Sequence, residues 1–151
     1  MLGRLPVLLV ENDPVDTMNL QRAFERCRIP NRLICTGNGE EALALLRSAP
    51  ARAQRPGLIL LDLNMPVMSG LEFLEIQKRD ADLRSIPVVV MTSSRRESDR
   101  RKSYELGAAG FVTKPLQFDE FARVVDTIYR YWALCEQPWG KRPYPRVAAL
   151  R

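Results

Sequence analysis

The chain has 151 residues, of which 27% are charged and 46% hydrophobic, so a single soluble domain with a sizeable core is the expected organisation. No apolar run approaches the about 20 residues that a membrane-spanning helix needs. The absence of histidine excludes histidine acid–base chemistry, most transition-metal sites and a role as a phosphohistidine carrier. Cys27, Cys35 and Cys135 have no metal-binding or disulfide spacing, so a bound metal would need oxygen ligands, as Mg²⁺ does.

The net charge of +5 raises the question of a nucleic-acid partner. Much of the excess lies in residues 95–102 and in the last eleven residues, without a recognition motif beside it. This pattern is typical of solvated helix faces and tails, and we expect neither a nucleic-acid nor a membrane partner. The first residues lack the layout of a signal peptide, which predicts a cytoplasmic protein.

Short apolar runs alternate with amphipathic segments along the chain. Asp13-Pro14 is a typical helix start, with Asp13 as the N-cap and Asp16 in the first turn. We expect this helix to direct Met18, Leu20, Ala23 and Phe24 inward. Three pairs with capping-box spacing predict further helix starts: Asn38 with Glu41, Ser69 with Glu72, and Ser94 with Glu97. In chain order we expect strand 5–10, a helix from 13 to about 28, strand 32–36, a helix from 38, strand 58–61, a helix from 69, strand 86–91, a helix from 94 to about 107, strand 110–113 and helix 118–134.

Strict strand–helix alternation predicts an α/β fold: a doubly wound parallel sheet with helices on both faces. The predicted elements fill residues 1–134, one domain without internal repeats. Residues 135–151 are rich in proline, arginine and aromatic residues and are too few to fold alone, so we interpret them as a C-terminal arm.

Polar residues follow four of the predicted strands. They are Glu11-Asn12-Asp13, Asp62, Thr92 and Lys114. The carboxyl ends of parallel strands share one edge, where ligands bind. A carboxylate can attack a phosphoryl group there, with a divalent cation, a hydroxyl and a lysine offsetting the charge. The alternative for Asp62 is a loop aspartate that caps the next helix.

These motifs together resemble the receiver domain of two-component response regulators, over roughly residues 5–134. The supporting stretches are Leu8-Leu9-Val10-Glu11, Leu60-Leu61-Asp62-Leu63-Asn64-Met65-Pro66 with Ser69-Gly70, Val90-Met91-Thr92-Ser93, and Gly107-Ala108-Ala109-Gly110-Phe111-Val112-Thr113-Lys114-Pro115. The resemblance implies a flavodoxin-like (βα)5 sheet of order 2-1-3-4-5. It also implies a signalling protein that accepts a phosphoryl group, not an enzyme in the ordinary sense.

The resemblance assigns roles to individual residues. Asp62 matches the phospho-acceptor, Thr92 the switch hydroxyl, Ser93 the small residue after it, Phe111 the switch aromatic, and Lys114 the phosphoryl-binding lysine before a cis bond to Pro115. A partner histidine kinase would supply the phosphoryl group. An aspartyl-phosphate hydrolase is disfavoured, because residues 11–13 do not form its Asp-x-Asp arrangement.

The implied Mg²⁺ ligands are Glu11, Asn12, Asp62 and the backbone carbonyl of Asn64. Asn12 stands where the family usually has a second metal-binding acid, and Asp13 is committed as the helix cap. We therefore expect weakened Mg²⁺ binding and slower phosphorylation. The alternative is a pseudo-receiver, an interaction or scaffold module that does not turn over phosphate.

A looser resemblance links the chain to the single-domain regulators associated with bacterial phytochromes. It rests on Glu11-Asn12-Asp13-Pro14, Asp16, residues 82–87 and Tyr131-Trp132. It implies a bacteriophytochrome as the possible kinase and a homodimer, built either on the fourth helix, fifth strand and fifth helix or on an exchanged C-terminal arm. The candidate dimer residues are Phe121, Val125, Ile128, Tyr131 and Trp132. The alternative is that these residues form intradomain core.

Overall fold

The computed structural model describes residues 5–48 and 55–136, and the elements below lie within those ranges. One sheet holds five parallel strands in the order β2-β1-β3-β4-β5, as the sequence predicted. The strands are β1 (Val7–Val10), β2 (Leu33–Thr36), β3 (Leu58–Leu61), β4 (Val88–Thr92) and β5 (Gly110–Thr113).

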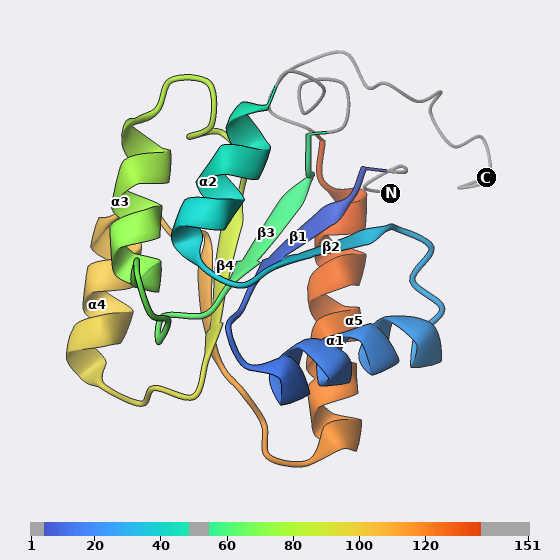
Figure 1. Cartoon of the computed structure of the whole chain (residues 1–151). Helices are drawn as coiled ribbons and strands as arrows, with labels where there is room; N and C mark the ends of the chain where they lie inside the picture. The colour runs from blue at the N-terminus through green and yellow to red at the C-terminus, as the bar shows by residue number, and fades with distance from the viewer. Residues whose placement is uncertain (1–4, 49–54, 137–151) are drawn as a thin grey trace.

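Five helices cover the two faces of this sheet (Figure 1). They are α1 (Pro14–Arg26), α2 (Gly39–Arg47), α3 (Gly70–Arg79), α4 (Glu97–Glu105) and α5 (Phe118–Leu134). Helices α1 and α5 lie on one face, and α2, α3 and α4 lie on the other. The bounds of β3, β5 and α5 coincide with the predicted ones.

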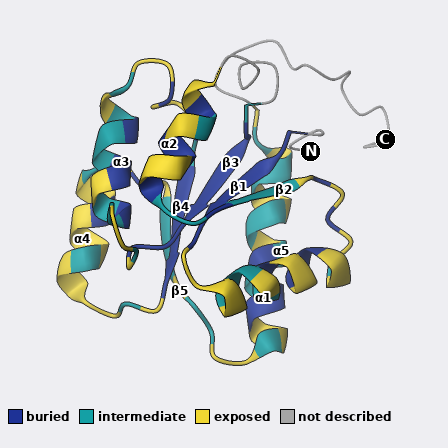
Figure 2. Ribbon diagram, viewed as in Figure 1, coloured by how far each residue is buried: buried dark blue, intermediate teal, exposed yellow. Residues whose placement is uncertain are grey.

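Two apolar layers hold the helices against the sheet. One side of β1 and β3, including Leu8 and Ile59, packs against α2 and α3, and the alternate residues, including Leu9 and Leu60, pack against α1 and α5. Every residue of β1, β3 and β4 is buried, whereas β2 and β5 at the edges are largely half-buried (Figure 2). This burial on both faces explains why the central strands are uninterrupted apolar runs.

Side-chain caps begin three of the helices as predicted. The carboxylate of Asp13 accepts a hydrogen bond from the backbone N–H of Val15 at 2.8 Å. The Asn38 side-chain oxygen accepts from Glu41 N–H at 2.8 Å, and Ser69 Oγ accepts from Glu72 N–H at 3.2 Å. These contacts satisfy N–H groups that have no partner inside the helix. They also fix where each helix starts, relative to the strand end before it.

Two local predictions were wrong. The capping pair of Ser94 with Glu97 does not form: α4 begins after Arg96, and the Ser94 hydroxyl instead donates to Asp99 at 2.6 Å. The Ser94 Oγ atom accepts from Arg96 N–H at 3.3 Å and not from Glu97 N–H, and the two contacts hold the serine in the loop before α4. Met18, expected to point inward, is 52% exposed, because α1 turns its buried stripe of Leu20, Ala23 and Phe24 to the sheet.

Helix α4 has an unusually polar surface and buries only Ser103. The Tyr104 hydroxyl accepts a hydrogen bond from the backbone N–H of Phe111 at 3.1 Å and so connects α4 to the edge strand β5. Among the described residues, no helix combines the length and apolar character needed to cross a membrane. Residues 137–151, most of the predicted arm, lie outside the described part of the chain.

Candidate functional site

Asp62 follows β3 at the carboxyl edge of the sheet, and its side chain is only 8% exposed. The N-terminus of α3 packs directly under it: Gly70 N–H donates to the Leu63 carbonyl at 2.9 Å. A Cβ atom built on Gly70 would lie 2.3 Å from the Asp62 carbonyl oxygen, so only glycine permits this approach. The backbone that carries the Asp62 carboxylate is therefore clamped between β3 and α3.

Glu11 brings a second carboxylate to the same edge from the end of β1. Its side chain is 3% exposed, and its Oε2 atom accepts from the Asp13 backbone N–H at 3.2 Å. Residues Val10 and Leu61 are partners in the β1–β3 register, so Glu11 and Asp62 follow neighbouring strands at the same level. This register confirms the inference that both acids lie at one edge of the sheet.

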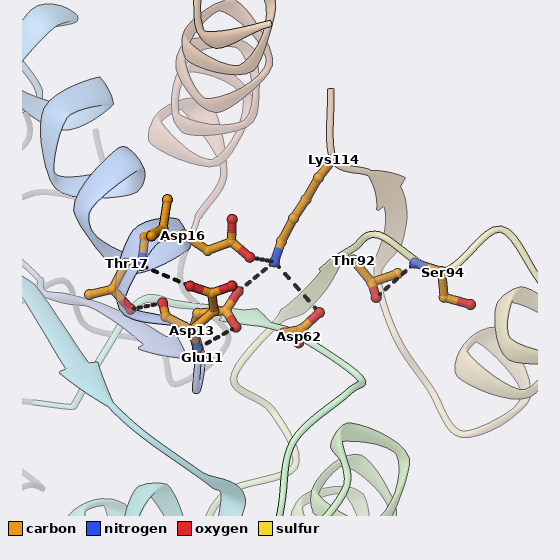
Figure 3. A network of polar contacts seen from close by, with 9 residues as sticks. Glu11, Asp13, Asp16, Thr17, Asp62, Thr92, Ser94 and Lys114 are labelled. Atoms are coloured by element: carbon orange, nitrogen blue, oxygen red, sulfur yellow. Dashed lines mark hydrogen bonds and ion pairs between the residues drawn. The ribbon is translucent and has the colours of Figure 1, made fainter. Parts of the chain in front are cut away.

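Lys114 lies between these carboxylates, as Figure 3 shows. Its Nζ atom is 2.5 Å from Glu11 Oε1, 2.9 Å from Asp16 Oδ2 and 3.6 Å from Asp62 Oδ1. The first two contacts are hydrogen bonds, whereas the third is an ion pair without one. The lysine enters from the end of β5, where its backbone N–H donates to the Thr92 carbonyl at 2.8 Å.

Burial and charge pairing act in opposite directions on this cluster. Burial lowers the pKa of Lys114, but the hydrogen bonds to Glu11 and Asp16 and the charges of Asp62 and Glu11 outweigh it, so the pKa of Lys114 is raised. Burial raises the pKa of Glu11, and the contact with Lys114 only partly offsets this. Lys114 is therefore held firmly as a cation in the crevice.

Asp16 is a member of this cluster that sequence reasoning assigned only to the first turn of α1. Its carboxylate is 33% exposed and reaches Lys114 from the side opposite Thr92 (Figure 3). The sequence did hold a signal for this position, because a helix that starts at Asp13-Pro14 places residue 16 in its first turn, close to the edge of the sheet where the strands end. Which way its side chain points depends on the packing of α1 against α5, which the local sequence does not contain.

Thr92 and Ser93 lie at the end of β4. Thr92 is fully buried, and its hydroxyl oxygen accepts from Ser94 N–H at 3.2 Å. Ser93 is exposed, and Phe111 is half-buried against the core layer of α2 and α3. The Lys114–Pro115 bond is trans, which corrects the expected cis bond; trans is the commoner state of such bonds.

Oxygen donors at this edge suit a hard divalent cation. Glu11 and Asp62 converge on one ammonium, so their geometry already accommodates a positive charge. Mg²⁺ in proteins commonly uses one or two carboxylates and keeps several waters. Asn12 and Asn64 are both exposed beside the pair, and within the described ranges no group of three metal-binding acids, cysteines or histidines occurs. The residues fit Mg²⁺, with few charged ligands.

The candidate dimer residues on α5 divide into two groups. Phe121 and Val125 are 8% and 2% exposed and belong to the core layer shared with α1. Ile128 and Trp132 are half-buried against the same layer, whereas Tyr131 is 59% exposed. Of these five candidate residues, Tyr131 alone is exposed, near the C-terminal end of α5.

A buried aspartate after β3, a bridging lysine after β5 and a hydroxyl after β4, on a sheet of this order, define the receiver domains of response regulators, which are signalling proteins of two-component systems. The family model for the response regulator receiver domain matches residues 7–126. The chain belongs to this family.

Similar proteins include single-domain regulators. The chain is 36% identical over 140 residues to the probable methanogenesis regulatory protein FilR2 of Methanothrix harundinacea, covering 92% of this chain and 88% of FilR2. It is 37% identical over 128 residues to response regulator Rcp1 of Synechocystis, covering 83% and 87%.

Solved structures of phytochrome-associated regulators have the same fold. The phosphorylated cyanobacterial phytochrome response regulator RcpA superimposes with a TM-score of 0.82 at 34% identity, covering 90% of this chain and 99% of RcpA. The Mn²⁺-bound form of Rcp1 gives 0.79 at 35% identity, covering 89% and 99%.

Proposed function

We propose that this protein is a phosphorylation switch in which Asp62 accepts a phosphoryl group from the phosphohistidine of a histidine kinase. The observation that supports this proposal most strongly is the Lys114 ammonium, held by Glu11 and Asp16 only 3.6 Å from Asp62. A lysine in that position has a counter-charge ready for phosphoryl oxygens on Asp62.

In the proposed step an Asp62 oxygen attacks phosphorus, the phosphorus–nitrogen bond to the kinase imidazole breaks, and the imidazole leaves with that electron pair. Glu11 and Asp62, with oxygen donors from Asn12 and Asn64, would hold Mg²⁺, which offsets the negative charge of the phosphoryl oxygens when bound. Lys114 and the Thr92 hydroxyl would then bind the transferred group.

The new phosphoryl group adds about −1.5 to −2 charge at neutral pH. Thr92 moving onto it would leave Ser94 N–H, and the half-buried Phe111 would turn into the space vacated beside β4. That change would alter the surface of α4, β5 and α5, the face that a partner reads. The Tyr104–Phe111 contact lies on this face.

The similarity to Rcp1 and RcpA supports a bacteriophytochrome as the kinase. FilR2, which has a comparable identity, is named as a methanogenesis regulator and not as a phytochrome regulator. We therefore propose a histidine kinase as the partner, and a bacteriophytochrome as the narrower form of that proposal.

We also propose a homodimer through the end of α5, where Tyr131 and Leu134 are 59% and 71% exposed. Cytoplasmic location follows from a kinase partner of this kind.

The test is Mg²⁺-dependent phosphate incorporation from a small acyl phosphate. Wild type should label, Asp62→Asn should not, and Asn12→Asp should label faster because it adds a charged cation ligand. Exposed Asp82 gives the matched control, since Asp82→Asn removes a carboxylate outside the site. Labelling that persists in Asp62→Asn would refute the assignment.

The uncharged, exposed Asn12 favours one second candidate, an interaction module with silent chemistry. In that case wild type would not label, and Asn12→Asp alone would restore labelling.

A further inference from the structure

We propose that Asp16 is a positioning residue that holds and neutralises Lys114, and that this lets a site without an acid at position 12 keep its affinity for a divalent cation. The inference rests on the proposed function of Asp62 and extends it to a residue outside the motif. It starts from the 2.9 Å hydrogen bond between Lys114 Nζ and Asp16 Oδ2.

The charges in the crevice show what Asp16 contributes. Glu11 and Asp62, each paired with Lys114, carry together with it a combined formal charge of minus one. Asp16, through its own ion pair with Lys114, brings the cluster to minus two, which matches the charge of one Mg²⁺ ion. An acid at position 12 would produce the same total without Asp16.

The hydrogen bonds of Lys114 show how Asp16 acts. An ammonium has three N–H donors, and here one goes to Glu11 and one to Asp16, while Asp62 is farther away at 3.6 Å. Without Asp16, the released N–H can turn to the Asp62 carboxylate, which lies 3.6 Å away. Lys114 would then compete with a cation for the oxygen atoms that bind it.

The neighbouring acid cannot take over this task. Asp13 is exposed, and its carboxylate is committed to Val15 N–H as the α1 cap. Asp16, one turn later, is half-buried and directed at Lys114 (Figure 3). Among the acids of α1, Asp16 alone forms an ion pair with this lysine in the described structure.

The test measures Mn²⁺ binding to the full chain, without phosphodonor, by electron paramagnetic resonance of the free ion. Asp16→Asn should raise the dissociation constant about tenfold, because the Lys114 ammonium is then released to compete with the divalent cation for the Asp62 carboxylate. Adding Asn12→Asp should restore wild-type affinity. The matched control is Asp119→Asn, which removes an exposed first-turn acid of α5 paired to Arg26, not to Lys114.

A second set of variants shows whether Asp16 acts by positioning Lys114, by its own charge on the cation, or through the stability of the fold. If Asp16 acts through the lysine, Asp16→Asn should change Mn²⁺ affinity less than twofold when Lys114 is already Met. Circular dichroism of each variant checks the fold. An unchanged dissociation constant in Asp16→Asn, an equal effect in the Lys114→Met background, or wild type that does not bind Mn²⁺ would each overturn the inference.

Phosphate incorporation is scored separately. Labelling of Asp62 with Mn²⁺ affinity unaffected by Asp16→Asn would refute this inference alone. The predicted affinity pattern without labelling would refute the proposed function alone.

Discussion

Replacing Gly70 by alanine tests whether the clamp on Asp62 matters. Gly70 is buried at the first position of α3, and an added Cβ would lie 2.3 Å from the Asp62 carbonyl oxygen and 2.6 Å from Leu63 Cα. Both contacts are with backbone, which cannot rotate away as a flexible side chain can. The strand end carrying Asp62 and the start of α3 must therefore separate.

The magnitude follows from that geometry. Bringing the Cβ–oxygen distance from 2.3 Å to the 3.0 Å that real Cβ contacts respect needs a shift of at least 0.7 Å. Overpacking of this kind lowers the free energy of unfolding by about 1–3 kcal/mol. The lower conformational entropy of the unfolded Gly70→Ala chain offsets about 0.4–1 kcal/mol of that loss. We expect a net loss of about 1–2 kcal/mol. A displacement near 1 Å at a reacting group costs about 100-fold in rate, so phosphorylation should slow by about 10- to 100-fold.

Urea unfolding gives the stability and initial labelling by an acyl phosphate gives the rate, both for Gly70→Ala. Gly110→Ala is the control, because its added Cβ would meet only Val89 methyl groups at 3.8 Å. The control should unfold and label like wild type or slightly better. Wild-type stability and labelling of Gly70→Ala would refute the clamp.

Three further predictions concern single contacts. Because the pKa of Lys114 is raised in the folded state, its charge stabilises the fold below the unfolded lysine pKa of about 10.4, and this contribution is lost as pH rises through the folded pKa. Urea titrations of wild type and Lys114→Met should therefore give a difference in unfolding free energy that falls above about pH 10.4. A difference that does not change with pH would contradict this prediction. Asp13→Ala should lower the unfolding free energy by about 1 kcal/mol through loss of the α1 cap, whereas Asp13→Asn should lose much less. Tyr104→Phe should cost about 0.5–1.5 kcal/mol and speed hydrogen exchange at Phe111 N–H, and unchanged exchange there would show that the contact is absent in solution.

Much of the fold followed from local pattern. The central strands are unbroken apolar runs because both faces are covered, and Asp13, Asn38 and Ser69 mark helix starts because each cap bonds an N–H within three residues. Ser94 shows the limit of that logic. Its hydroxyl oxygen accepts from Arg96 N–H and its hydroxyl donates to Asp99, so it does not cap α4.

The candidate site followed from topology together with motif. Parallel strands in a known order bring Glu11, Asp62, Thr92 and Lys114 to one edge, whatever lies between them in the chain. Asp16 was missed as a site residue because its role depends on a contact with Lys114, 98 residues away. On α5, amphipathic spacing alone did not separate Phe121 and Val125, which α1 covers, from Tyr131, which is exposed.

By itself, the sequence determined the alternation of elements, the strand ends that carry chemistry and the missing acid at position 12, because these depend on residue type and near neighbours. Only the tertiary structure decided which carboxylates hold Lys114, how closely α3 approaches Asp62 and which residues of α5 are exposed. Those properties are set by distances between segments remote in the chain, and such distances exist only once the helices have packed on the sheet.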